Sequence, residues 1–90
     1  MAKIKVEKPS KEKLKELGVE SWGIWECDSS TFDWQYPADE TAYVLEGNVK
    51  VKEEGGEEVE FGAGDLVFFP KGLKCVWEVK EKIKKRYIGG

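Results

Sequence analysis

The sequence contains no histidine among its 90 residues. Histidine is the most common general base near neutral pH and the most common metal ligand, and the serine–histidine and cysteine–histidine catalytic pairs require it. Any reaction would have to use a carboxylate, a thiol, a lysine or a tyrosine instead. We therefore leave open whether the chain is an enzyme, and the missing imidazole weighs against it.

Cysteine and long apolar runs are also scarce. The two cysteines, Cys27 and Cys75, lie far apart in a chain rich enough in aromatic residues to need no disulfide, which favours free thiols in a reducing compartment. No apolar stretch approaches the ~20 residues that span a bilayer, and the first residues lack the apolar segment of a signal peptide. We therefore expect a cytoplasmic protein with no membrane partner; an organellar location after removal of a transit peptide is the alternative.

Neither sign of charge is in large excess, since 15 lysine and arginine residues stand against 18 aspartate and glutamate residues, for a net charge of −3. The lysines form no single stripe that could follow a phosphate backbone, so we expect no nucleic-acid partner. One basic cluster, from Lys80 to Arg86, is interrupted by Glu81 and Ile83. Its alternation with apolar residues predicts the solvent-facing side of a late strand.

A short helix is predicted near the N-terminus, because Ser10 is a good capping residue and helix formers run from it to Gly18. Beyond that point, short runs of period two alternate with turn residues and predict antiparallel strands. The length allows one domain, residues 1–90, with a strand and the helix in about 1–20 and the remainder in about 21–90.

The predicted strands make the chain all-β, and so many short strands bury their apolar faces by closing into a barrel or a two-sheet jelly roll. Besides an N-terminal strand around residues 4–6, we expect eight, at residues 22–27, 31–36, 42–46, 48–53, 57–61, 66–69, 74–80 and 83–88.

Two blocks of the sequence resemble those of the cupin superfamily. Residues 64–75 follow the family pattern of glycine, five residues, proline, one residue, glycine, two residues and histidine, except that Cys75 takes the histidine position. In the earlier block, Trp34 and Tyr36 take two further histidine positions, whereas Glu40 is retained. The metal-binding histidines of the family are therefore replaced.

The resemblance implies a cupin-type double-stranded β-helix, which is a jelly-roll barrel of antiparallel strands, here with one short N-terminal helix. More specifically, residues 32–36 and 40–47 resemble the small single-domain cupins grouped with the (S)-ureidoglycine aminohydrolase cupin domain. Cupins often pair through β surfaces, so the resemblance also favours a homodimer.

Residues two apart on a strand share a face, so Trp34 and Tyr36 point together, as do Cys75 and Trp77. If both faces point into the barrel, these side chains line one pocket together with Glu40. An aromatic lining with a few polar groups is the usual form of a small-molecule site. We therefore predict a barrel pocket for a small organic ligand, formed by Trp34, Tyr36, Glu40, Cys75 and Trp77 and gated by Glu40.

A cupin metal site normally has three imidazoles and one carboxylate, and of these only Glu40 remains, so we expect no cofactor. The alternative is a metal-assisted hydrolase resembling ureidoglycine aminohydrolase, in which Glu40, Cys75 and Tyr36 hold manganese, zinc or iron. A second alternative is a structural or dimerisation module, because small barrels are commonly sealed by their own side chains.

Overall fold

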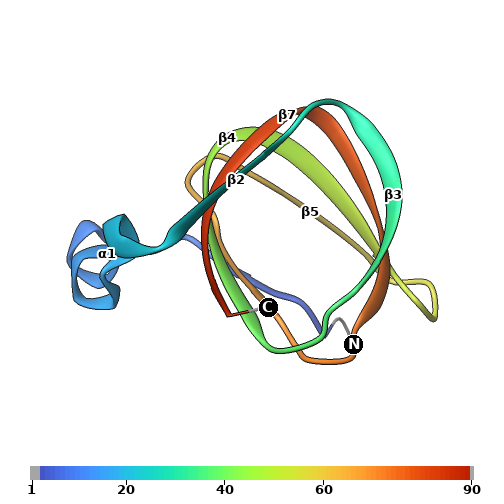
Figure 1. The fold of residues 1–90 in the computed structure, drawn as a ribbon, viewed down its shortest axis with the longest axis horizontal. Coiled ribbons are helices and arrows are strands. Elements are labelled where there is room, and N and C mark those ends of the chain that lie inside the picture. The colour runs from blue at the N-terminus through green and yellow to red at the C-terminus, as the bar shows by residue number, and fades with distance from the viewer. Residues whose placement is uncertain (1–2, 90) are drawn as a thin grey trace.

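Antiparallel strands curve around a common interior, and the short helix α1 lies to one side of them (Figure 1). The computed structural model describes residues 3–89. In chain order its elements are β1 (Lys5–Glu7), α1 (Lys11–Leu17), the 3-10 helix η1 (Val19–Ser21), β2 (Gly23–Cys27), β3 (Ser30–Gln35), β4 (Glu40–Glu53), β5 (Glu58–Gly62), β6 (Leu66–Phe69) and β7 (Lys74–Gly89). The strands form one sheet in the order β1-β6-β4-β7-β2, with β3 also paired to β7 and β5 to β4.

The two longest strands, β4 and β7, form the frame of the barrel. About eight strands were expected after the helix, but residues 18–89 hold six. The strands predicted at 42–46 and 48–53 are continuous, as are those predicted at 74–80 and 83–88. Gly47 is the reason in β4: it adopts a φ of 102° within a run of register shifts, so the strand bends and continues. A Cβ on Gly47 would lie 2.8 Å from Cα of Ile83 on β7, which is too close, so only glycine fits at this position.

The predicted helix is confirmed. The backbone N–H of Lys13 donates to Ser10 Oγ at 3.1 Å, which satisfies one of the free N–H groups of the first turn. Gly18 ends the helix with a φ of 69°, in the left-handed region that favours glycine. Within residues 3–89, no helix is long and apolar enough to cross a bilayer.

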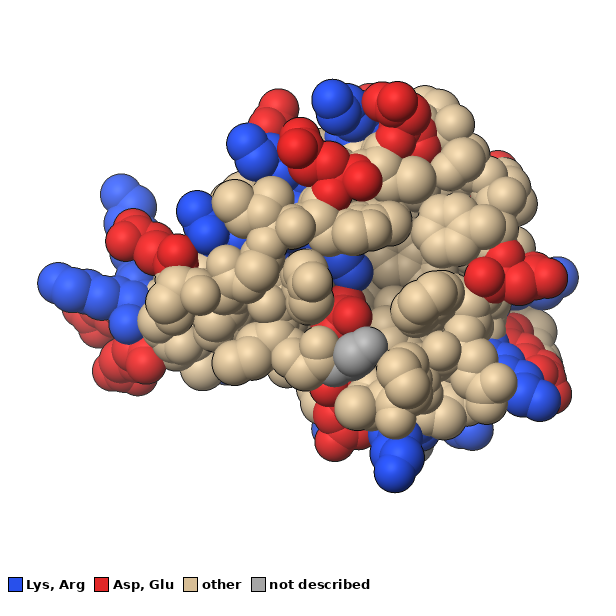
Figure 2. Space-filling model, viewed as in Figure 1, with Lys and Arg blue, Asp and Glu red and all other residues tan. Residues whose placement is uncertain are grey.

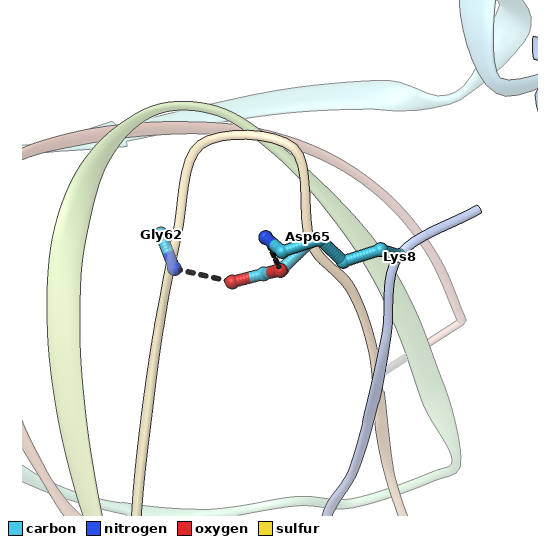
Figure 3. A network of polar contacts seen from close by, with 3 residues as sticks. All are labelled: Lys8, Gly62 and Asp65. Atoms are coloured by element: carbon cyan, nitrogen blue, oxygen red, sulfur yellow. Dashed lines mark hydrogen bonds and ion pairs between the residues drawn. The ribbon is translucent and has the colours of Figure 1, made fainter. Parts of the chain in front are cut away.

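Strand β1 covers the outer edge of β6, and a polar contact fixes the chain just beyond it (Figure 3). Lys8 Nζ donates to Asp65 Oδ1 at 2.6 Å, while Asp65 Oδ2 accepts from the backbone N–H of Gly62 at 2.8 Å. The same carboxylate therefore closes the turn between β5 and β6 and binds the N-terminal segment. Strand β6 lies between β1 and β4. Both of its faces are apolar because Val67 and Phe69 pack in the barrel core, whereas Leu66 packs in a second cluster with Val19 and Trp22.

The barrel interior is filled mainly by aromatic and β-branched side chains. Tyr36 and Phe69 stack with ring centroids 4.7 Å apart, and Trp77 lies 5.7 Å from both Phe61 and Phe69. Trp77 and Phe69 are almost fully buried. Tyr36 is the member of this layer that also lines a cavity beside β2 and β3.

Candidate functional site

A cavity of about 590 Å³ opens beside β2, β3 and β7. Figure 2 shows uncharged side chains around a hollow on this face, with charged side chains gathered mostly at the outer rim. Most of the lining is aromatic, with few polar groups, which is the usual composition of a small-molecule site. The residues that line it are Trp25, Cys27, Phe32, Asp33, Trp34, Tyr36, Glu40, Lys85 and Tyr87.

A buried ion pair forms the polar part of this cavity. Lys85 Nζ on β7 donates to Glu40 Oε2, at the first residue of β4, over 2.7 Å, and the two side chains are only 7% and 9% exposed. The ammonium also lies over the rings of Trp77 and Trp25, at 4.9 and 5.0 Å from their centroids. Aromatic faces attract a cation at these distances, so the rings and the carboxylate together hold Lys85 in place.

Burial lowers the pKa of the Lys85 ammonium, because a charged amine loses its hydration there. The charge of Glu40 and the hydrogen bond to it act in the opposite direction, but desolvation is the larger effect. The amine therefore gives up its proton more readily than an exposed lysine does.

The expectation that residues 80–86 form a solvent-facing side was wrong for Lys85. Strand β7 places Ile83, Lys85 and Tyr87 on one face, and that face turns inward, with Ile83 fully buried. The two-residue period of the sequence contained this signal, since an apolar side chain flanks Lys85 two positions away on either side. The charged neighbours of Lys85 in the sequence favoured the incorrect assignment of this side chain to the surface.

Three of the five predicted pocket residues line this cavity. They are Trp34, which is 46% exposed, Tyr36 and Glu40. Trp77 faces inward as expected, but Trp25 and Phe32 pack over its ring and it does not line the cavity. Its indole N–H instead donates to the Tyr36 hydroxyl at 3.2 Å, so Trp77 fixes the position of a residue that does line the cavity.

Cys75 does not line this cavity. It pairs in register with Trp34 and Glu53 and borders a second depression, of about 830 Å³, near the turn at Gly55. Its thiol donates to the Trp34 carbonyl at 3.6 Å, and burial raises its pKa to about 11, so it is a neutral thiol near neutral pH. The cysteine that lines the main cavity is Cys27.

The side chains present do not fit a cupin metal ion. Glu40 is engaged by Lys85, and burial beside Glu40 raises the pKa of the Tyr36 phenol far above its ordinary range, so a phenolate ligand is disfavoured. Cys75 borders the other depression. In the part of the chain that the structure describes, no three cysteine, aspartate and glutamate side chains come close enough to share a metal ion.

Sequence reasoning missed Lys85 and Tyr87 on β7, and it assigned Trp25 and Phe32 no place in the pocket. Trp25 pairs directly with Lys85 across β2 and β7, and Phe32 pairs with Trp77 across β3 and β7. Their alternation along the strands shows that they share faces, but the strand pairing that brings them to one cavity is visible only in the fold.

Comparison with known proteins identifies the fold. The family model described as the EutQ-like cupin domain matches residues 14–87. A curated relative named acetate kinase EutQ, from Clostridioides difficile, is 33% identical over 66 residues, which are 73% of this chain and 41% of that protein. The corresponding protein of Salmonella typhimurium is also 33% identical, over 28% of its length. The chain thus spans less than half of the curated relatives that it matches.

Solved structures agree with this assignment. A DUF861 family protein from Thermotoga maritima superposes with a TM-score of 0.96 at 52% identity, over 98% of this chain and 100% of that one. The Clostridium difficile EutQ protein superposes with a TM-score of 0.66 at 28% identity, over 93% of this chain and 64% of that one. The all-β barrel predicted from the sequence is confirmed, whereas the resemblance to the ureidoglycine aminohydrolase group stays a prediction. The chain belongs to the EutQ-like cupin domain family.

Proposed function

We propose that this cupin domain binds a small, neutral organic ligand in the aromatic cavity. The observation that carries the proposal is the Glu40–Lys85 ion pair, which lies buried in the cavity wall among aromatic rings. The rings offer apolar surface to the body of a ligand, and the ion pair offers its polar head both a donor and an acceptor. The cavity of about 590 Å³ falls within the range that holds small ligands.

The balance of charge selects a neutral ligand. Glu40 and Lys85 neutralise one another over 2.7 Å where both side chains are buried, and Asp33, the other charged side chain of the lining, is exposed to solvent. A charged ligand would add an uncompensated charge to this low-dielectric site, which is costly. An ammonium has three N–H donors and a carboxylate has two acceptor oxygens, so an amide-like head could accept from Lys85 while it donates to Glu40.

The alternatives fit the cavity less well. A sealed structural barrel would leave little space, whereas the lining residues here enclose about 590 Å³. A hydrolase resembling ureidoglycine aminohydrolase would need a metal, and the side chains proposed to hold one are divided between two depressions. The name of the curated relatives makes acetate a useful probe, although those proteins are much longer than this chain.

The test is a titration with four probes: benzamide, benzoate, benzylamine and acetate. Binding is followed by NMR of the tryptophan indole N–H groups. Trp25 and Trp34 line the cavity, whereas Trp22 packs in a separate cluster with Val19 and Leu66 and serves as an internal control. We expect benzamide to bind most tightly and to shift the signals of Trp25 and Trp34 but not of Trp22.

Two variants separate the polar contact from general effects. Glu40→Gln should weaken benzamide binding about tenfold, which corresponds to the loss of about 1.4 kcal/mol from one charge-assisted hydrogen bond. The matched control is Glu60→Gln, which changes an exposed glutamate on β5 and should leave affinity unchanged. Absence of any indole shift, or equal affinity in the Glu40 variant, would remove the proposal; tighter binding of benzoate or acetate would replace a neutral ligand with an anionic one.

A further inference from the structure

Lys85 is placed as a nucleophile would be. Among residues 3–89 it is the one lysine that is buried, and it borders the same cavity as the aromatic rings. Most lysines of proteins lie in water as fully charged ammonium groups and do not react with carbonyl compounds efficiently. A lysine that is desolvated in an apolar pocket is the kind that forms imines with carbonyl compounds.

We propose that Lys85 forms a reversible imine with small aldehydes or ketones that enter the aromatic cavity. This inference rests on the proposed function of the same cavity and specifies the class of ligand: a neutral carbonyl compound with an apolar body. Such a compound satisfies the charge balance of the Glu40–Lys85 pair, because it brings no charge of its own.

Glu40 supplies the proton transfers that the reaction needs. Its Oε2 lies 2.7 Å from Lys85 Nζ, so it can take one ammonium proton directly and release the lone pair of the amine. The lowered pKa of Lys85 acts in the same direction. The lysine is therefore prepared for attack by its position and by its surroundings together.

The Lys85 nitrogen attacks the carbonyl carbon, the C–N bond forms and the π electrons of the carbonyl move to its oxygen, which takes up the proton held by Glu40. Glu40 then takes a second proton from nitrogen and passes it to the hydroxyl, the C–O bond breaks and water leaves. The ammonium and the carbonyl compound have become a protonated imine and one water, with no oxidant or reductant consumed. Hydrolysis returns the free lysine.

The surrounding aromatic rings stabilise the protonated imine relative to the unmodified amine of Lys85. A protonated imine keeps one positive charge beside Glu40 and close to the faces of Trp25 and Trp77, where the ammonium lies now. The apolar walls limit the water that would hydrolyse it. Tyr36, whose hydroxyl accepts a hydrogen bond from Trp77, lines the same cavity, so an entering carbonyl compound would lie beside it.

The experiment uses benzaldehyde as the probe, with cyanoborohydride present to reduce any imine to a stable benzylamine adduct. The full chain is treated at about pH 7, digested and mapped by mass spectrometry. We expect Lys85 to be modified several-fold faster than exposed lysines such as Lys82 on the same strand, because Lys85 borders the cavity that takes up the probe and Glu40 lies 2.7 Å from its Nζ to accept the proton.

Two variants and one ligand control complete the test. Lys85→Arg should abolish the fast adduct, while Lys82→Arg should leave it unchanged. Benzyl alcohol, which has a similar shape but no carbonyl group, should slow the modification of Lys85 by competition and leave Lys82 unaffected. Because the wild-type peptide map locates the adduct by itself, the result does not depend on how well the Lys85 variant folds.

Modification of Lys85 and Lys82 at equal rates would overturn the inference. The two proposals fail in distinguishable ways. If benzamide binds and shifts Trp25 and Trp34 but Lys85 is not modified selectively, the binding function stands and the imine is refuted. If none of the probes binds and Lys85 shows no selectivity, both are refuted.

Discussion

Replacing Glu40 with glutamine should lower the free energy of unfolding by about 3 kcal/mol near pH 7, because the buried Lys85 ammonium then has no negative partner. Both side chains of the pair are more than nine-tenths buried, and removing one member of such a pair typically costs about 3–5 kcal/mol. Glutamine keeps an acceptor oxygen and the rings of Trp25 and Trp77 still face the cation, so we expect the lower end of that range.

The loss should depend on pH in a defined direction. In the wild type, burial lowers the pKa of Lys85 and the charge of Glu40 raises it, so loss of that charge lowers the pKa further. A group whose pKa is lower in the folded than in the unfolded state destabilises the fold while it is charged, and this effect fades as pH rises towards the ordinary lysine value of about 10.4. The deficit of Glu40→Gln should therefore be largest near neutral pH and shrink towards about pH 10.

The assay is urea unfolding at about pH 7 and about pH 10, with thermal melts in parallel. A loss of about 3 kcal/mol in a domain of this size lowers the melting temperature by about 12–24 °C. Glu60→Gln is the control, since the Lys80–Glu60 pair is 39% and 50% exposed and should contribute less than about 1 kcal/mol. The other titratable groups around the cavity are the same in the wild type and the variant: Cys27, Asp33, Tyr36 and Tyr87.

Two results would refute this reasoning. One is a Glu40→Gln deficit no larger than that of Glu60→Gln, which would mean that the ion pair is not effectively buried. The other is an equal deficit at both pH values, which would mean that the ammonium of Lys85 is not the group left unpaired. The double variant Glu40→Leu with Lys85→Met should recover much of the loss, because replacing a whole buried pair with apolar side chains is often neutral.

Three further predictions concern other parts of the barrel. Tyr36→Phe leaves the buried indole N–H of Trp77 without its acceptor and should cost about 1–3 kcal/mol in urea unfolding; an unchanged midpoint would contradict the role of this contact. Iodoacetamide at about pH 8 should modify Cys27 well before Cys75, because burial raises the pKa of Cys75 to about 11. Mass spectrometry gives the order of modification, and earlier modification of Cys75 would contradict this prediction. The expected homodimer remains a prediction: Ile88 on β7 is 53% exposed, Ile88→Glu should shift sedimentation to a monomer, and a wild-type chain that sediments as a monomer would rule the dimer out.

The local parts of the fold could be predicted from the sequence because the determining residues are neighbours. Ser10 and Gly18 bracket the helix, and both of these positions adopt the expected backbone. Gly64 and Gly72 of the family pattern adopt φ values of 91° and 83° just before β6 and β7. Gly47 was ambiguous, since a glycine in a strand signals either a turn or a bulge. Only the pairing of β4 with β7 decides between the two.

The candidate site was less predictable because its members come from distant parts of the chain. Alternation correctly places Cys75 and Trp77 on the inward face, but it gives no depth along the barrel. In the structure Cys75 borders the second depression, and the rings of Trp25 and Phe32 pack over Trp77. The partner of Glu40 lies 45 residues further on in the chain. A lysine among other lysines is ordinarily assigned to the surface, and the strand pairing that buries Lys85 is a long-range property.

The central position of β7 bears on how the polypeptide acquires its shape. This strand follows all the others in the described chain, yet it pairs with β2, β3 and β4. Among the strands of residues 3–89, β2 and β3 pair only with β7, so neither can form its sheet hydrogen bonds while a ribosome is still producing residues 74–89. Closure must therefore wait until translation has passed this segment, and pairings between such distant residues form slowly. Nascent chains should thus expose unpaired strand edges, which makes them clients for chaperones before they fold.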